Sequence, residues 1–433
     1  MLSPQSAPVV RATLPAVRNA LDEVAERFYA GMFADRPELL RDLFNRGNQA
    51  NGAQRRALAG SVVHFAGALT GEPGTRPDVL LERIAHRHAA LGVTSEQYKL
   101  VQRYLFGALA EVLGDAVTPE VAAAWDEVYW LMANALIARE ARLYQEAGVA
   151  EGDIWRAMRV TGRTEEAPGV VSFTLTRADG GPNGPFLPGQ FVSVRSELPD
   201  GARQIRQYSL SAGPHREEWR ITVKRAGGGP AGEGGDAAVD PEGEVSHWLH
   251  ARVRPGDLLT VSAPFGGVAL DTGGQDGADS SGDGPLLLVS AGIGCTPMVS
   301  MLDHLAASGS RRRVIVVHAD RSPAHHAHHA ELDRLVGELP GAEAHLWYEE
   351  AHAAVPGARA GRADLGALEL PEGLTAYVCG PSPFLRAVRG DLLRGGVPAA
   401  DIRYEIFGPD QSPGAHPDAD VPSPEADARG TGE

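Results

Sequence analysis

Two histidines lie two positions apart in the stretch LLERIAHRHAAL, and each is a candidate metal ligand or hydrogen-bonding core residue. On a helix, His88 shares a face with Ile84 and Leu91, whereas His86 lies with Glu82 on another, because residues two apart do not face the same way. The pattern therefore predicts that His88 points into an apolar core. A histidine on an apolar face is more often a hydrogen-bonded core residue than a ligand, and periodicity alone favours that interpretation.

A glycine-containing loop follows a buried apolar run in LLLVSAGIGCTPM. The loop, called here the nucleotide loop, is residues 292–297: Gly292-Ile293-Gly294-Cys295-Thr296-Pro297. Glycines at such a turn allow the backbone to approach a pyrophosphate at the start of the next helix. The loop differs from the six-residue dinucleotide fingerprint, and its place between a predicted strand and a predicted helix is what indicates nucleotide binding.

A second motif, Arg206-Gln207-Tyr208-Ser209, follows the segment FLPGQFVSVRS. The two segments together are similar to the flavin-binding strands of ferredoxin-reductase-like enzymes, with Phe191 at a position where tyrosine is commoner. In such a site the arginine offers its guanidinium to the FAD pyrophosphate, the tyrosine stacks on the isoalloxazine and the serine binds the flavin edge. The tetrapeptide alone is weak evidence, and its position after PGQF makes it strong.

The order of periodic patterns along the chain predicts three domains. Residues 1–150 show apolar side chains at three- and four-residue spacing, which predicts an all-α domain. Residues 151–270 carry short β-branched runs broken by glycine and proline, which predict an antiparallel β-barrel. Residues 285–409 alternate apolar runs with helical segments, a pattern typical of a parallel α/β sheet. The expected fold is therefore a multidomain protein of these three parts.

Composition limits what the chain can bind and where it works. A chain of 433 residues is too long for one hydrophobic core, and its net charge of −16 argues against nucleic-acid and anionic-membrane partners. No segment approaches the roughly 20 apolar residues of a membrane span, and the N-terminal stretch lacks a signal-peptide pattern. We therefore expect no nucleic-acid partner, no membrane span and a cytoplasmic location.

Several segments lack the composition of a packed core. Residues 226–242 and 272–284 are rich in glycine and acidic residues, so we expect surface loops there, and residues 410–433 are expected to form a disordered acidic tail. Two cysteines far apart in the sequence, Cys295 and Cys379, are too few for a disulfide framework.

The stretch IAHRHAALGVTSEQY, with a possible capping box at Thr94 and Gln97, resembles the proximal side of the flavohaemoglobin haem pocket. The resemblance implies that His88 ligates the iron of haem b and that Tyr98 and Glu140 support it. A carboxylate that accepts the second imidazole N–H makes the imidazole more electron-donating. Without the resemblance, Glu140 would be interpreted as a surface residue among neighbouring arginines.

The distal side of the same pocket is also represented. Tyr29 in the first long helix, Phe44 after the next proline, and Gln54 with Leu58 in NQANGAQRRAL match the family's distal set. The resemblance implies that Tyr29 and Gln54 hydrogen-bond iron-bound oxygen, that Leu58 limits access and that Phe44 stacks on the porphyrin. Tyr29 on its own would be interpreted as a core aromatic residue.

The remaining two thirds resemble the family's reductase. The resemblance implies that the nucleotide loop and a second segment, Cys379-Gly380-Pro381, clamp NAD(P)H near the flavin, with Cys295 at a position where glutamine is expected. Ser246 in GEVSHWLH belongs to a second phosphate-side element. The family's C-terminal element against the flavin corresponds to Glu405-Ile406-Phe407-Gly408-Pro409, in which Glu405 tunes flavin or haem potential.

These parts imply a nitric oxide dioxygenase in which electrons pass from NADH or NADPH to FAD and then to haem. Its partners would be O2, nitric oxide and NAD(P)H, with no obligatory protein partner. Two alternatives stay open: a different activity at the same haem, such as alkylhydroperoxide or lipid chemistry, and an oxygen carrier or sensor kept ferrous by its reductase. The sequence Asp320-Arg321-Ser322 leaves the choice of NADH or NADPH open, because an acid favours a free ribose hydroxyl and Arg with Ser favours a 2′-phosphate.

Overall fold

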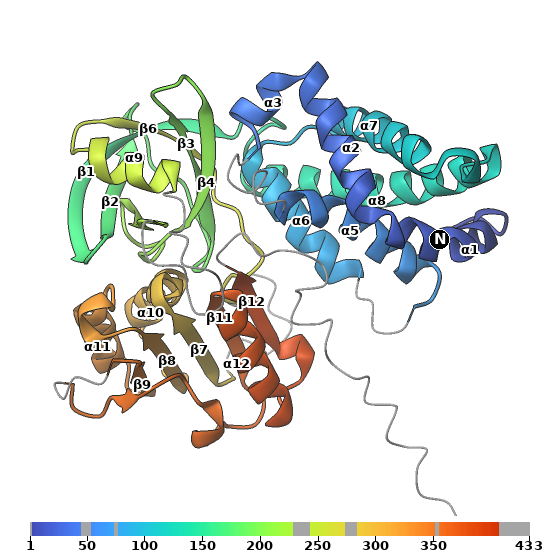
Figure 1. Ribbon diagram of the computed structural model, residues 1–433. Helices are drawn as coiled ribbons and strands as arrows, with labels where there is room; N and C mark the ends of the chain where they lie inside the picture. Colours follow the sequence, from blue (N-terminus) through green and yellow to red (C-terminus); the bar gives the residue numbers. More distant parts are fainter. Residues whose placement is uncertain are drawn as a thin grey trace, which may run out of the picture. The chain divides into compact units, whose positions relative to one another are not determined.

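The chain forms two compact units that divide between Ile154 and Trp155. The computed structural model describes residues 2–44, 53–72, 77–227, 243–272, 284–350 and 355–406, with backbone alone for residues 53–57 (Figure 1). Phe407, Gly408 and Pro409, and the predicted tail after them, therefore lie outside the described residues.

The first unit is helical. Its described helices are α1 (Ser6–Asn19), α2 (Leu21–Asp35), α3 (Pro37–Asp42), α5 (Ala53–Leu69), α6 (Pro77–Leu91), α7 (Ser95–Leu113) and α8 (Pro119–Glu146). Helix α2 packs on α5 and α7, and α8 packs on α1 and α6. The three- and four-residue spacing predicted for this domain gives α2 a stripe of buried apolar side chains, since Val24, Phe28 and Met32 are each at most 2% exposed. Burial of each such side chain contributes roughly 1.5–3 kcal/mol.

The second unit begins with an antiparallel barrel. Its strands are β1 (Trp155–Ala167), β2 (Val170–Arg177), β3 (Phe191–Glu197), β4 (Arg203–Ser209), β5 (Trp219–Lys224) and β6 (Leu258–Ser262), in the order β4-β3-β6-β1-β2-β5. Just after β4, Leu210 bridges Ile221 of β5, which joins the two edges of the sheet. Helix α9 (Glu244–Arg252) follows β5 along the described chain and packs against it. The predicted antiparallel barrel is confirmed.

A parallel sheet completes the second unit. Its strands are β7 (Leu286–Ala291), β8 (Val314–Asp320), β9 (Ala342–Tyr348), β10 (Arg359–Ala360), β11 (Thr375–Gly380) and β12 (Ile402–Ile406), in the order β10-β9-β8-β7-β11-β12. Every pair of neighbouring strands in this sheet is parallel, so the predicted α/β sheet is also confirmed.

Alternating side chains of β7 explain why helices cover both faces of this sheet. Leu286 and Leu288 pack in one core with α10 (Cys295–Ala307) and α11 (His329–Glu338). Leu287 and Val289 pack in another core with α12 (Ser382–Arg394). A strand buried on both faces reads as a continuous apolar run, as LLLV does.

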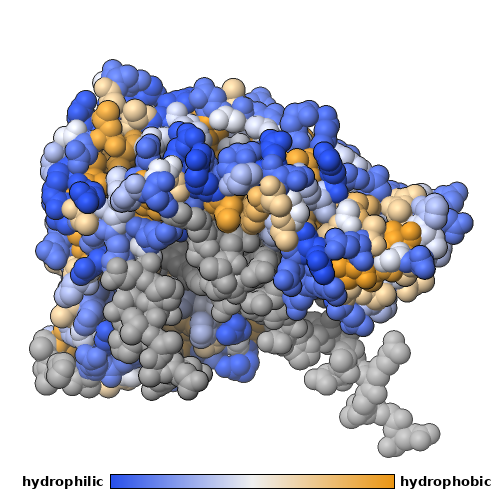
Figure 2. Space-filling model, turned by 45° about the horizontal axis from the view of Figure 1, so that its top comes forward, coloured by the Kyte–Doolittle hydropathy of each residue, from blue (hydrophilic) through white to orange (hydrophobic). Residues whose placement is uncertain are grey.

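The described surface carries few large apolar side chains. Leu187 and Leu258 are the large hydrophobic residues exposed within the described ranges, at 46% and 55%. On the face shown in Figure 2, hydrophobic residues appear in separate patches among hydrophilic ones. None of the helices that the structure describes is long and apolar enough to cross a membrane.

Candidate functional site

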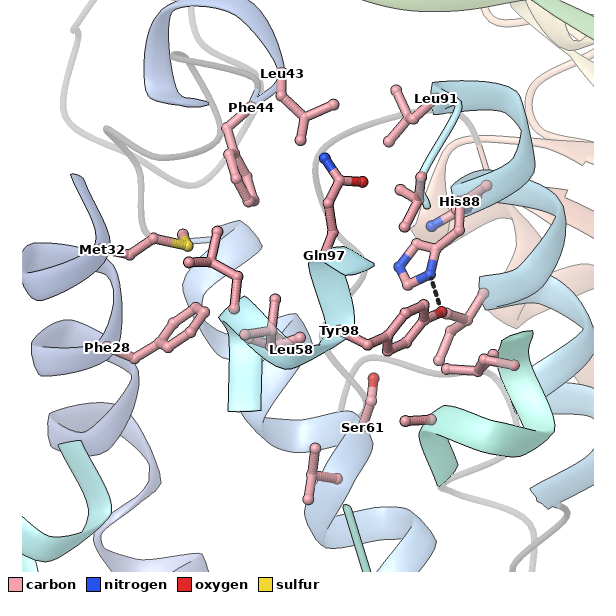
Figure 3. A pocket seen from close by; sticks show the side chains of 18 of the residues that line it. Phe28, Met32, Leu43, Phe44, Leu58, Ser61, His88, Leu91, Gln97 and Tyr98 are labelled. Carbon is pink, nitrogen blue, oxygen red and sulfur yellow. Dashed lines mark hydrogen bonds between the residues drawn. The ribbon is translucent and has the colours of Figure 1, made fainter. Parts of the chain in front are cut away.

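A cavity of about 290 Å³ opens among the helices of the first unit. Its wall is mostly apolar and comes from α2, α5, α6, α7, α8 and the segment around Phe44. Figure 3 shows Phe28, Met32 and Phe44 on one side of the cavity and His88 with Tyr98 on the other. Leu58 lies on α5 between these sides. A space of this kind suits a large apolar group that also needs one nitrogen ligand.

His88 reaches the cavity from the last turn of α6. Its Nδ1 atom is 2.8 Å from the Tyr98 hydroxyl and 2.9 Å from Oε1 of Glu140. The Tyr98 hydroxyl also donates to the same Glu140 oxygen at 2.5 Å. Among the described residues, the ring's hydrogen-bond partners thus meet it at Nδ1. The opposite nitrogen, Nε2, is the one able to bind a metal.

Burial shapes the environment of Glu140 and Tyr98. Glu140 lies on α8 and is 3% exposed, so the interpretation as a surface residue does not hold. Burial, followed by the charge of Glu140, raises the pKa of Tyr98 far above its ordinary value, so the phenol stays protonated and donates. With a carboxylate acceptor at Nδ1, the imidazole favours the tautomer that carries its proton there. That tautomer leaves the lone pair on Nε2.

Local structure holds the trio in place. Gly92 ends α6 with φ of +73°, the left-handed conformation that glycine adopts readily, and the chain turns into α7. The backbone N–H of Thr94 donates to the Gln97 side chain at 2.9 Å, as the predicted capping box requires. The Tyr129 hydroxyl donates to the carbonyl oxygen of Tyr98 at 2.6 Å, which ties α8 to α7.

His86 has a different role from His88. Its Nε2 atom lies 3.2 Å from Glu82 Oε1 on the same helix, and its side chain is 10% exposed. The side chain of His88 is 29% exposed, because it borders the cavity. Low exposure alone would therefore indicate His86 as the inward-facing histidine. Helical periodicity instead indicates His88, which lines the cavity.

The opposite wall contains most of the predicted distal residues. Tyr29 is 4% exposed and packs edge-on against Phe44, with ring centroids 5.7 Å apart. Tyr29, Phe44 and Leu58 all line the cavity. Gln54 belongs to α5, but its side chain lies outside the described residues.

Ser61 on α5 and Arg87 on α6 also line the cavity and were not predicted to do so. Gln97 on α7, predicted only as part of a capping box, lines the cavity as well. Ser61 follows Leu58 by three residues, so helical spacing was a signal for it. Arg87 directly precedes His88, but charged residues at such positions are usually solvated, and the sequence offers no signal that distinguishes this one.

The predicted flavin residues lie on adjacent strands of the barrel. Arg206 and Tyr208 alternate with Gln207 and Ser209 along β4, so the members of each pair share one face of the sheet. Phe191 starts β3 opposite Ser209. Burial raises the pKa of Tyr208, which keeps its phenol neutral. An arginine and an aromatic residue on one face fit a phosphate-bearing aromatic cofactor.

Ser246 lies in the first turn of α9 and is engaged locally. Its hydroxyl donates to the carbonyl oxygen of Gly243 at 3.0 Å and accepts from the backbone N–H of Ala226 at 3.1 Å. It therefore joins the end of the β5 segment to the start of α9. Phosphate contact at this position would come from the helix N-terminus that Ser246 organises.

The nucleotide loop connects β7 to α10 through a 3₁₀ turn at Gly292–Gly294. Gly292 has φ of +53°, which favours glycine. A Cβ at Gly294 would clash with the carbonyl oxygen of Cys379, so this glycine lets the two predicted nucleotide segments touch. The loop follows β7 and the second segment includes the end of β11, so both lie at the carboxyl ends of neighbouring parallel strands, where dinucleotides bind in α/β sheets.

This edge is largely buried, although Ile293 is half-buried and Pro381 is exposed. Ile293 lies at the loop tip, Thr296 donates its hydroxyl to the Ile293 carbonyl at 2.9 Å, and Pro297 is buried in α10. Gly380 pairs with Ile406 and Cys379 with Glu405 across β11 and β12, and Pro381 caps α12. The strand register therefore brings Glu405 beside the second nucleotide segment.

Both cysteines are fully buried. Burial raises the pKa of Cys295 to about 12 and that of Cys379 well above its ordinary value. A thiol of this kind is a poor nucleophile, because the thiolate is the reactive form. Cys295 therefore serves packing rather than thiol chemistry.

Comparison with known proteins agrees with the cavity of the first unit and with the nucleotide segments of the second. A globin model matches residues 26–136, and a model of the oxidoreductase NAD-binding domain matches residues 288–390. A flavohemoprotein from Bordetella pertussis is 40% identical over 423 residues, covering 94% of this chain and 99% of that protein. The chain belongs to the flavohemoprotein family. A flavohemoprotein from Deinococcus radiodurans is 38% identical over 430 residues, covering 95% of this chain and 98% of the relative.

Solved structures of flavohemoproteins extend the likeness to the fold. The crystal structure of a flavohemoglobin from Malassezia yamatoensis with bound FAD and heme has a TM-score of 0.82 at 35% identity, covering 94% of this chain and all of that one. The FAD/NAD-binding domain of a nitric oxide dioxygenase from Vibrio cholerae has a TM-score of 0.50 at 34% identity, covering 58% of this chain and 98% of that one.

Proposed function

We propose that this chain binds haem b, FAD and NAD(P)H and oxidises nitric oxide to nitrate with O2. The observation that carries the proposal is the contact of Glu140 and Tyr98 with Nδ1 of His88 beside an apolar cavity. A histidine held in this way fits haem, because its Nε2 is left to bind iron while apolar walls enclose the porphyrin. The Malassezia yamatoensis relative, with its bound FAD and heme, supports the same assignment.

The trio around His88 acts through electron donation. Bound haem would supply an iron that binds O2, and bound FAD would divide the two electrons of a hydride into single transfers. Glu140 accepts the Nδ1 proton of His88 in a hydrogen bond and gives the ring partial imidazolate character. Tyr98 donates to the same carboxylate and holds it against the ring. A donating proximal ligand favours oxygen activation over simple oxygen storage.

Tyr29 and the apolar wall act on the opposite side. Tyr29, which packs against Phe28 and Phe44, is proposed to donate its phenol hydrogen to the gas ligand. A buried donor stabilises developing negative charge more than an exposed one does, because the surrounding dielectric is low. Leu58 and Phe44 narrow the space around it. Gln54 is proposed as a second donor on family resemblance.

The second unit would supply the electrons. Arg206 and Tyr208 are proposed to hold the FAD pyrophosphate and ring, with Gln207, Ser209 and Phe191 beside them and the α9 segment of Ser246 on the phosphate side. The nucleotide loop and the segment at residues 379–381 are proposed to hold NAD(P)H at the sheet edge. Glu405 lies beside that edge and is proposed to influence the flavin potential. Because both units belong to one chain, no protein partner is required.

Electron counting gives the test. Conversion of one nitric oxide and one O2 to nitrate needs one electron, and one NAD(P)H provides two, so two molecules of nitric oxide disappear for each NAD(P)H. The purified protein with both cofactors is mixed in air with nitric oxide and NADH, then NADPH, while both reactants are followed. Nitric-oxide-dependent oxidation at this ratio supports the proposal. Slow NAD(P)H oxidation that nitric oxide does not change would favour an oxygen carrier or sensor, and consumption that follows added alkylhydroperoxide would favour peroxide chemistry.

A further inference from the structure

His328 adopts an unusual backbone conformation directly before α11. Its φ is +60° and its ψ is 20°, and it is the non-glycine residue with positive φ within the described ranges. Its side chain is 1% exposed. A conformation of this kind costs roughly 1–3 kcal/mol and persists where the surroundings impose it. The contacts of the imidazole show what imposes it.

The imidazole of His328 connects the parallel-sheet domain to the barrel. Its Nε2 is 2.9 Å from the Thr222 hydroxyl on β5, and its Nδ1 is 3.4 Å from Glu166 Oε2 on β1. The same Nδ1 lies 3.1 Å from Oε2 of Glu331 on α11, the helix that His328 precedes. One buried ring thus contacts two barrel strands and one nucleotide-domain helix.

The polar groups around His328 form a closed network. The Thr222 hydroxyl is 2.8 Å from the Ser211 hydroxyl, which accepts from Arg220 Nε at 3.2 Å. Arg220 also donates to Glu331 at 2.8 Å, which returns the network to His328. Burial alone would raise the pKa of Glu331, but hydrogen bonds from His328 and Arg220 outweigh it and lower the pKa. The carboxylate therefore stays charged inside the network.

The nucleotide loop packs at the same contact between the barrel and the parallel-sheet domain, which is called here the seam. Cys295 packs in a buried cluster with Ala327, the residue before His328, and with Ala167 and Val170 of the barrel. The Sγ atom of Cys295 is 3.6 Å from the carbonyl oxygen of Ala327. A shift of the His328 segment would therefore move the start of α10, where the nucleotide loop ends.

We propose that His328 is a positioning residue for hydride transfer from NAD(P)H to FAD. Its hydrogen bond to Thr222 and its contact with Glu166 hold the nucleotide loop at a fixed place relative to the barrel that carries the flavin residues. The rate of hydride transfer depends on where the nucleotide lies relative to the flavin, because a displacement of about 1 Å between reacting groups can slow a reaction about a hundredfold. The inference rests on the NAD(P)H-to-FAD step of the proposed function.

Two single variants and a control separate positioning from stability. His328→Gly removes the ring and also relieves the strain of the positive φ. If the ring has only a structural role, this variant should be no less stable than other variants that shorten a buried side chain. Thr222→Val removes the barrel partner at nearly constant volume. The control is His345→Gln, a half-buried histidine of β9 whose nearest charged partner is Glu343 at 3.8 Å.

The first readout is flavin reduction in the FAD-loaded full chain, mixed without oxygen with saturating NADH and, separately, NADPH. We expect the rate per bound flavin to fall at least tenfold in His328→Gly and in Thr222→Val, with unchanged flavin content and a larger isotope effect from deuterated NADH. The double variant should be no slower than the slower single variant, because both remove one connection. His345→Gln should match the unchanged protein.

The second readout needs no turnover. Hydrogen exchange of the oxidised protein should become faster in both variants at residues 166–172 and 327–333, on the two sides of the seam, and remain unchanged in His345→Gln. Unchanged flavin reduction in His328→Gly and Thr222→Val overturns the positioning role and leaves the proposed function standing. If neither NADH nor NADPH reduces the flavin of the unaltered chain, the proposed function and this inference both fail.

Discussion

Nδ1 of His88 and Oε1 of Glu140 lie 2.9 Å apart, although 52 positions separate the two residues in the sequence. Packing of α6 on α8 brings them together, and burial of Glu140 leaves its charge to be stabilised by His88 and Tyr98. A buried carboxylate is expensive unless it is hydrogen-bonded, so these three side chains depend on one another. Replacing Glu140 with glutamine removes the charge of the carboxylate and nearly keeps the shape of the side chain.

Glu140→Gln should retain haem but lower the electron donation of His88. The amide cannot draw the Nδ1 proton as a carboxylate does, so the ferric state loses stabilisation and the haem midpoint potential should rise. Loss of such a supporting group typically reduces metal-site activity roughly 10- to 100-fold, and we expect nitric oxide turnover to fall within that range. Redox titration and the iron–histidine vibration, which should move to lower frequency, measure the effect.

The matched control is Glu82→Gln, which alters the partner of His86 instead of that of His88. It should leave the haem potential and the vibration unchanged. Equal potentials in Glu140→Gln and in the unaltered chain would contradict the electron-donating role of Glu140.

Tyr29→Phe tests the distal donor with almost no change of volume. A hydrogen bond to a charged group contributes about 1.5–3 kcal/mol, so loss of the phenol should speed oxygen dissociation roughly 10- to 100-fold. Flavin reduction by NAD(P)H should stay the same. Stopped-flow oxygen release from both proteins makes the comparison, and an off-rate that hardly moves would mean that Tyr29 only fills the core.

In the first unit, helical periodicity predicted both a buried helix face and the histidine that lines the cavity. The stripe of α2 and the choice of His88 over His86 as the cavity residue both follow from three- and four-residue spacing, because one helical face is local information. Strand β1 was not predicted. Its buried Met158 and Val160 alternate with polar residues, and two register shifts interrupt its pairing with β2, so no apolar run marks it.

Contacts between distant segments account for what the sequence could not predict. Gly294 was interpreted as a site of pyrophosphate approach, and the structure adds that the carbonyl oxygen of Cys379 occupies the place of its Cβ. The contact of His328 with Thr222 joins residues 106 positions apart, and neither neighbourhood in the sequence indicates it. Such pairs are set by how domains pack, which no local pattern encodes.

A second buried carboxylate predicts a pH dependence of stability. Asp303 on α10 accepts from Arg216 at 2.7 Å and from the backbone N–H of Gly213 at 2.8 Å, and its side chain is 3% exposed. Burial alone would raise the pKa of Asp303, but these hydrogen bonds outweigh it and lower the pKa. A lowered folded-state pKa adds stability that is present above the unfolded-state value and is lost as pH falls through the folded-state value.

Asp303→Asn should therefore reduce the unfolding free energy at pH 7 by about 1–2 kcal/mol, a modest figure because Arg216 is half exposed. The difference from the unaltered chain should begin to shrink below about pH 4, where the carboxylate of the unfolded chain takes up a proton, and should disappear as pH falls through the lowered native pKa. Urea unfolding between pH 7 and pH 3.5 measures it, with Asp401→Asn, at a partly exposed position, as control. A difference that stays constant across this range would contradict the account.

The two cysteines should resist thiol reagents in the folded protein. Burial keeps Cys295 and Cys379 protonated and out of reach of solvent. Treatment with an alkylating reagent at pH 8 should leave both unmodified by mass spectrometry, whereas the same treatment in denaturant should modify both. Rapid labelling of Cys295 in the native protein would instead indicate a reactive thiol.

We expect His88 to bind haem iron through Nε2, and haem titration of the matched variants His88→Gly and His86→Gly tests this. His88→Gly should lose the Soret band of bound haem while FAD absorption stays, and added imidazole should restore the band by filling the space of the missing ring. His86→Gly should bind haem as the unaltered chain does, because its ring pairs with Glu82 instead of lining the cavity. Retention of haem by His88→Gly together with its loss from His86→Gly would contradict the claim.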